Sequence, residues 1–102
     1  MVSYNISSDY NQKMTITVRD VKYHITLRSF RGMLYCTIID DDDKILAANI
    51  RCINDHWLIP LKNRYRGGNL RFEGLKDHYI HPVDFEKIKL VYYDSDEMVE
   101  VE

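Results

Sequence analysis

Four consecutive aspartates at residues 40–43 form the densest group of potential metal ligands in the sequence. Carboxylates at alternate positions can supply the oxygen ligands that Ca²⁺ prefers, but a helix–loop–helix calcium loop also needs a glycine at its sixth position and a glutamate at its twelfth. Counted from Asp40, these positions hold Ile45 and Arg51. Because aspartate is common in turns, we interpret the run as a solvated hairpin turn.

The histidines and cysteines lack the spacing of a zinc site. His78 and His81 are three residues apart, but no second pair of ligands occurs at a set spacing. Cys36 and Cys52 stand in apolar segments, and there is no Gly-x-Ser-x-Gly motif, so no activated nucleophile can be identified. We therefore expect neither an enzyme nor a bound metal or cofactor.

Basic and aromatic residues surround a pair of glycines at residues 67 and 68, and they comprise Lys62, Arg64, Tyr65, Arg66, Arg71 and Phe72. Cations and an aromatic ring at a turn could bind single-stranded nucleic acid. They could equally form a protein interface, where Arg and Tyr are enriched. With 14 basic and 16 acidic residues the formal net charge is −2, which favours the protein interface over nucleic acid.

Apolar and polar residues alternate with a period of two along most of the chain, which is typical of strands with one buried face. We expect strands over residues 2–6, 14–18, 21–27, 33–39, 44–53, 70–73 and 88–93. Residues 28–32 break the pattern, and Arg19 and Asp20 close a tight hairpin with both apolar sets on one face. Apolar groups on both faces of residues 33–39 indicate a central strand.

Joined by short turns, these strands predict an all-β, mainly antiparallel fold, either a small sandwich or a partly open barrel. Residues 57–59 precede Pro60, so they are expected at a sheet edge or in a loop. Gly67 and Gly68 can both adopt positive φ and give the strongest turn signal in the chain.

The length of 102 residues predicts one domain, which we place at residues 1–93, followed by an acidic segment at 94–102. That segment is either a solvated tail or, because valine and glutamate alternate in it, a strand that adds to a neighbour's open sheet edge. No apolar run is long enough to span a bilayer, and residues 1–10 lack the features of a signal peptide. We expect no membrane contact and synthesis in the cytoplasm.

Four segments, VKYHITLRSFRGMLYCTI, IRCINDHWLIPL, RGGNLRFEG and KLVYY, resemble in pattern and order the baseplate plug family of contractile-tailed bacteriophages, over residues 12–93. The resemblance implies a small β-rich virion protein without enzymatic activity. It would sit at the centre of the tail baseplate and contact hub proteins, tube proteins and neighbouring copies.

The recognisable positions of that family fall here on Arg28, Phe30, Gly32, Tyr35, Arg51, Cys52, Asn54, Pro60, Gly67, Gly68, Leu70 and Tyr92. We interpret them as fold determinants: turn glycines, an edge proline and core aromatics. The acidic segment after Tyr93 departs from the family pattern, and the resemblance offers no role for it.

From residue types and positions we expect partner contacts at Trp57, Tyr65, Arg66, Arg71, Val99 and Val101. Large aromatic side chains and arginines dominate the binding energy of protein interfaces. The alternative is a small β domain that binds single-stranded nucleic acid, or a protein target, through residues 64–72.

Overall fold

The protein is described by a computed structural model for residues 1–7, 9, 11–60, 68–74, 80 and 86–94. The strands of this part are β1 (Val2–Tyr4), β2 (Asn11–Val18), β3 (Val21–Phe30), β4 (Met33–Asp40), β5 (Ile45–Arg51), β6 (Asn69–Glu73) and β7 (Lys89–Tyr93). Among the same residues there is no helix of the length and apolar character needed to cross a bilayer.

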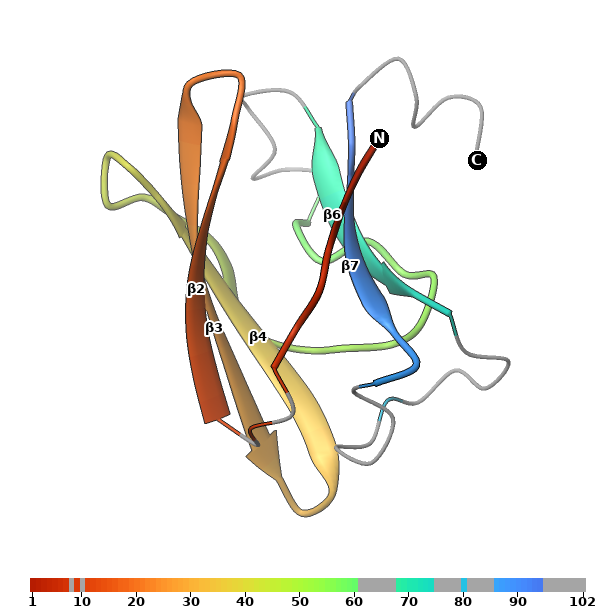
Figure 1. Ribbon diagram of the computed structural model, residues 1–102. Helices are drawn as coiled ribbons and strands as arrows, with labels where there is room; N and C mark the ends of the chain where they lie inside the picture. Colours follow the sequence, from red (N-terminus) through yellow and green to blue (C-terminus); the bar gives the residue numbers. More distant parts are fainter. Residues whose placement is uncertain (8, 10, 61–67, 75–79, 81–85, 95–102) are drawn as a thin grey trace.

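Two antiparallel sheets face each other (Figure 1). The larger sheet is a meander in the order β2-β3-β4-β5, and the smaller has the order β1-β7-β6. The strands do not close into a barrel. The predicted all-β antiparallel fold is confirmed, in its sandwich form.

The hairpin between β2 and β3 forms as predicted. Arg19 and Asp20 have φ angles of 52° and 65°, and positive φ at both central residues is the geometry of a type I′ turn, which matches the twist of the two strands. The register pairs Ile16 with Tyr23, so the apolar side chains of both strands point toward the other sheet. The central position of β4 is also confirmed, because it pairs with β3 and β5.

The expected break at residues 28–32 is wrong for its first part, because β3 continues to Phe30 and only Arg31 and Gly32 form the turn. The ladder is unbroken, with Arg28 opposite Tyr35 and Phe30 opposite Met33. Both Arg28 and Phe30 are exposed. The backbone hydrogen-bond ladder therefore continues beyond the last residue that follows the alternation of apolar and polar side chains.

The core lies between the sheets. The larger sheet contributes Leu27, Leu34 and Ile38, and the smaller contributes Phe72 and Leu90, all of them fully buried. Each such side chain stabilises the fold by about 1.5–3 kcal/mol relative to an exposed position. Tyr23 and Tyr92 meet across the gap with ring centroids 6.0 Å apart.

Cys36 and Cys52 are free thiols in this core, as expected. A hydrogen bond to Cys36 and burial both raise the pKa of the Cys52 thiol far above its usual value. Cys52 is therefore held in the neutral, unreactive form.

The aspartate run forms the predicted hairpin turn, but Asp40 is not solvated. Its side chain is fully buried, and its Oδ1 atom accepts hydrogen bonds of 2.9 Å from the backbone N–H groups of Asp42 and Lys44. The carboxylates of Asp40, Asp41 and Asp42 lie within 4.8 Å of one another. The described geometry gives Asp40 a structural role, which is to satisfy the backbone of the β4–β5 turn.

Gly68 was predicted as a turn residue that can adopt positive φ, but the structure shows a different reason for a glycine at this position. Its φ is not among the positive values of the described glycines, which are Gly32 and Gly74. Instead its backbone lies against β7, where its N–H donates to the Tyr92 hydroxyl at 3.1 Å and an added Cβ would overlap the Tyr93 carbonyl oxygen. Gly67 lies outside the described residues.

We predict that Gly68→Ala lowers the free energy of unfolding by about 3 kcal/mol, because backbone atoms of β7 would have to move. Urea denaturation followed by circular dichroism measures this loss. Gly32→Asn is the matched control: Gly32 is exposed with φ 76°, which Asn tolerates, so its cost should stay below about 1 kcal/mol. Equal costs for the two variants would contradict the close-packing explanation.

Candidate partner-binding site

The outer face of the smaller sheet carries a group of large side chains. Alternation along β6 and β7 directs Leu70, Phe72, Leu90 and Tyr92 into the core, and it directs the residues between them outward. The outward residues Val91 and Tyr93 are nevertheless only 3% and 6% exposed, and Trp57 packs against them. An aromatic layer therefore covers this side of the sheet.

Arg71 lies against two rings of this layer. Its guanidinium carbon is 4.8 Å from the centroid of the Trp57 ring and 5.1 Å from that of Tyr93. The two rings meet edge to face, with centroids 5.6 Å apart and an interplanar angle of 85°. Both distances from the cation are within the range of cation–π attraction.

Glu73 fixes the orientation of this group. Its Oε2 atom accepts a 2.7 Å hydrogen bond from Arg71 Nε and a 2.5 Å hydrogen bond from the Tyr93 hydroxyl. The Arg71 and Glu73 side chains are 15% and 28% exposed. We call Trp57, Arg71, Glu73 and Tyr93 the aromatic–arginine cluster.

Arg71 stays charged and Tyr93 stays neutral near neutral pH. Burial lowers the pKa of Arg71, but hydrogen bonds to Glu73 and Tyr93 outweigh it and raise the pKa overall. Burial, followed by the hydrogen bond to Glu73, raises the pKa of Tyr93 above its ordinary value. The cluster thus presents a fixed cation and a neutral phenol, an arrangement suited to binding and not to proton transfer.

Trp57 is positioned by a segment that runs along the edge of β6 that faces away from β7. Leu58 donates its N–H to the Leu70 carbonyl at 2.9 Å. The buried side chain of Asn69 then makes the two hydrogen bonds that a paired strand would make. Its Oδ1 accepts a hydrogen bond from the Ile59 N–H at 2.9 Å, and its Nδ2 donates one to the Ile59 carbonyl at 2.8 Å. As predicted, residues 57–59 lie outside the regular strands.

Asn69 was missed by sequence reasoning. It follows the glycine pair and looks like an ordinary turn residue, whereas its partner Ile59 is ten positions away. A local pattern contains no signal for a bond of this kind. Tyr93 and Glu73 were also missed as members of the site, although alternation on β6 already places Arg71 and Glu73 on one face.

We predict that Asn69→Ala costs about 2–4 kcal/mol of folding free energy, because it leaves both backbone groups of Ile59 without their buried partner. Trp57 is the only tryptophan, so its fluorescence should shift to longer wavelength as the segment loosens. Asn11→Ala is the control, since it removes one exposed 3.2 Å hydrogen bond to Ser29. Unchanged emission and stability in Asn69→Ala would contradict the role of Asn69 in holding residues 57–59 against β6.

Of the six expected contact residues, the structure brings together Trp57 and Arg71. Tyr65, Arg66, Val99 and Val101 lie outside the described residues and stay predictions. Phe72 is fully buried, so it cannot serve as the stacking ring that the nucleic-acid alternative requires. The division into residues 1–93 and 94–102 also stays a prediction.

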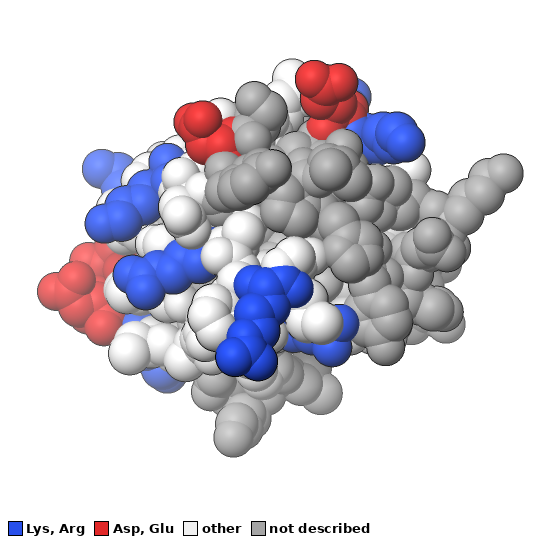
Figure 2. All heavy atoms as spheres, turned by 90° about the horizontal axis from the view of Figure 1, so that it is seen from below, with Lys and Arg blue, Asp and Glu red and all other residues white. Residues whose placement is uncertain are grey.

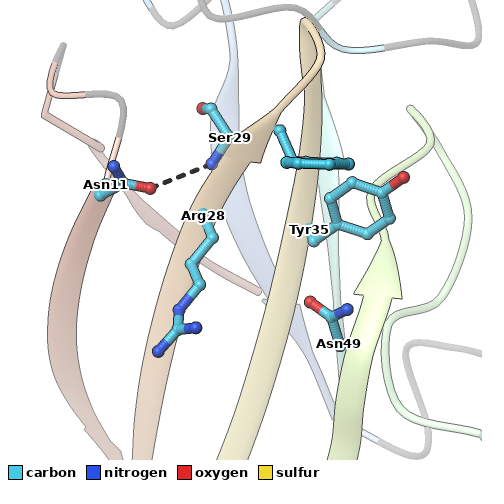
Figure 3. Close-up of a pocket in the computed structure, with 6 residues that line it drawn as sticks. Asn11, Arg28, Ser29, Tyr35 and Asn49 are labelled. Atoms are coloured by element: carbon cyan, nitrogen blue, oxygen red, sulfur yellow. Dashed lines mark hydrogen bonds between the residues drawn. The ribbon is translucent and has the colours of Figure 1, made fainter.

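A second surface lies on the outer face of the larger sheet. Asn11, Arg28, Tyr35 and Asn49 line a hollow of about 440 Å³ near the β3–β4 turn. Figure 3 shows their side chains. Phe30 also lines it and is 60% exposed, so the expectation that the family's aromatic positions belong to the core is wrong there. It is correct for Tyr92, which is buried.

The model of one protein family, described as cyanophage baseplate Pam3 plug gp18, matches residues 1–96. The chain belongs to this baseplate plug family. The resemblance inferred from the sequence is thereby confirmed, and it identifies a structural protein of the phage tail baseplate. No curated protein sequence matches the chain.

We predict that the stability of this plug protein falls above pH 10 and that part of the fall depends on Tyr93. The unfolded phenol loses its proton near pH 10, whereas the raised pKa keeps Tyr93 protonated in the fold. The folded state then binds more protons, so the free energy of unfolding decreases as pH rises.

Urea midpoints at pH 8–11 for wild type and Tyr93→Phe measure this dependence. The variant should lose less stability over the range than the wild type does. Tyr35→Phe, on the other sheet, controls for the loss of a hydroxyl. An identical slope for wild type and Tyr93→Phe would contradict the assignment.

Proposed function

We propose that this plug protein is an architectural subunit of the central baseplate of a contractile phage tail. In this role it packs against hub and tube proteins, and the aromatic–arginine cluster forms part of the contact. Family membership supports a baseplate position, and a structural role requires no chemical step. Synthesis would take place in the host cytoplasm before assembly.

The cluster is the observation that carries the proposed contact. Trp, Tyr and Arg are the residues that most often dominate binding energy at protein interfaces, and here one of each lies within 6 Å of the next. Trp57 remains partly exposed at the edge of the group. A partner that packs on Trp57 would therefore also cover Arg71.

Preorganisation is the second argument. Glu73 already holds the Arg71 and Tyr93 side chains in one geometry, so these side chains lose little conformational freedom when a partner binds. Association costs of this kind amount to about 0.5–1.5 kcal/mol for each side chain that must be immobilised. A rigid cluster thus suits a permanent position within a large assembly.

We predict that Trp57→Ala weakens co-purification of the plug with hub and tube proteins at least tenfold, because truncation of an interface hot spot costs about 2 kcal/mol or more. Co-expression with the hub and tube proteins, followed by affinity capture, measures the effect. Arg71→Lys should also weaken binding, since lysine cannot reproduce the planar contacts of the guanidinium.

Phe30→Ala is the matched control, because it also removes an aromatic side chain but from the larger sheet, at a residue that is 60% exposed. Each variant is first compared with wild type by thermal denaturation. If a folded Trp57→Ala protein co-purifies with the hub and tube proteins as well as wild type does, the aromatic–arginine cluster does not form the contact with them.

The competing function is binding of single-stranded nucleic acid through residues 64–72. Two observations weaken it: Phe72 is in the core, and Arg71 is engaged by Glu73. A titration with single-stranded RNA at several salt concentrations separates the two functions, because phosphate contacts weaken steeply as salt increases.

A further inference from the structure

We propose that the outer face of the larger sheet is a second docking surface, and that it binds an acidic segment of a protein partner. This face points away from the smaller sheet, whose outer face carries the aromatic–arginine cluster (Figure 1). The proposal therefore goes beyond the contact made through the cluster, because the plug would hold partners on both sides of the sandwich.

The first observation is that this face lacks acidic side chains. Asp40 is the only Asp or Glu in strands β2–β5, and it is fully buried, with its Oδ1 atom held by two backbone N–H groups. The outward positions of the four strands instead include the cations Lys13, Lys22, Arg28 and Arg51. Although the whole chain has a net charge of −2, this face is basic and attracts negative charge.

Most of these cations lie toward one end of the sheet. Figure 2 shows Lys and Arg side chains gathered at the end of the molecule that contains the β3–β4 turn, with acidic groups at its margin. Arg31, in that turn, adds a further cation. The basic area is therefore concentrated where the hollow near the β3–β4 turn also lies.

The second observation is a row of side chains across the sheet at this end. The register places Asn11 opposite Arg28, and Tyr35 lies between Arg28 and Arg51 on the strands to either side. Because neighbouring strands are about 4.8 Å apart, the backbones of the two arginines are about 10 Å apart. Two guanidinium groups on either side of a phenol can bind more than one carboxylate of the same segment.

The third observation is the hydrogen-bonding state of the side chains that line the hollow of about 440 Å³. Arg28 forms no ion pair within the described residues. The Tyr35 hydroxyl donates to the sulfur of Met33 at 4.0 Å, and a thioether is a weak acceptor. Figure 3 shows Arg28 and Tyr35 on adjacent strands. A carboxylate in the hollow would be a stronger acceptor for both side chains.

Two features favour a protein segment over nucleic acid. The far end of the sheet carries acidic turns, at Asp20 between β2 and β3 and at residues 41–43 between β4 and β5, so a long polyanion that followed the strands would approach these carboxylates. Base stacking also needs an open aromatic face, and the Arg31 guanidinium already lies 5.3 Å from the centroid of the Phe30 ring. A short acidic segment meets neither obstacle.

The test is a titration of the full-length plug against a fluorescein-labelled peptide of glutamate and glycine, followed by fluorescence anisotropy. Wild type should bind this peptide at least tenfold more tightly than the same peptide with glutamine in place of glutamate. Arg28→Gln should weaken binding of the glutamate peptide at least fivefold, because it removes the guanidinium that lines the hollow.

Lys89→Gln is the matched control. It also removes one positive charge, but from an exposed position on β7 in the other sheet, so it should change binding less than twofold. Phe30→Ala keeps every cation and should likewise change binding less than twofold. Thermal denaturation checks that each variant is folded. Absence of binding to the glutamate peptide, or equal losses in Arg28→Gln and Lys89→Gln, would overturn the proposal.

Two further outcomes would assign the face to a different occupant. If oligothymidylate of the same charge binds as tightly as the glutamate peptide, the face is a nucleic-acid site. If wild type self-associates in sedimentation experiments and Arg28→Gln abolishes this association, the occupant is a second copy of the plug. Either result would contradict the proposal.

These outcomes are independent of the proposed contact with hub and tube proteins. The titrations use the purified plug alone, and Trp57 and Arg71 stay intact in every variant. Conversely, loss of hub binding in Trp57→Ala would leave binding of the glutamate peptide unchanged.

Discussion

The two sheets bury one apolar face each against the other, and this packing determines which side chains are left for contacts. Inward positions such as Leu27, Leu34 and Phe72 fill the gap between the sheets. Because neighbouring residues of a strand point to opposite faces, Arg71 must face outward once Leu70 and Phe72 face inward. The candidate site therefore exists as a consequence of the core.

Much of the larger sheet could be predicted because its information is local. The β2–β3 hairpin follows from apolar alternation on both sides of two turn residues, and its register follows from the length of the turn. The same reasoning failed at Arg28 and Phe30, where the ladder continues although both side chains are exposed. It failed also at Asp40, since nothing in a run of aspartates distinguishes the one that turns inward.

The site could be predicted only in part, because it depends on contacts between distant segments. Trp57 and Arg71 were identified by residue type, but their meeting requires residues 57–59 to lie along β6. That depends on Asn69, whose side chain substitutes for a strand partner. Gly68 shows the same limit: its role is set by the hydroxyl of Tyr92, 24 positions further on.

The order of strands in the two sheets has a consequence for synthesis on the ribosome. The β2-β3-β4-β5 meander pairs only consecutive segments, so it can form as soon as residue 51 has emerged. In the other sheet β1 pairs with β7, so β1 cannot form its ladder until residues 89–93 have been made. A nascent or truncated polypeptide would thus contain a folded meander whose apolar face is exposed to solvent. Chaperones and proteases recognise such exposed apolar surface.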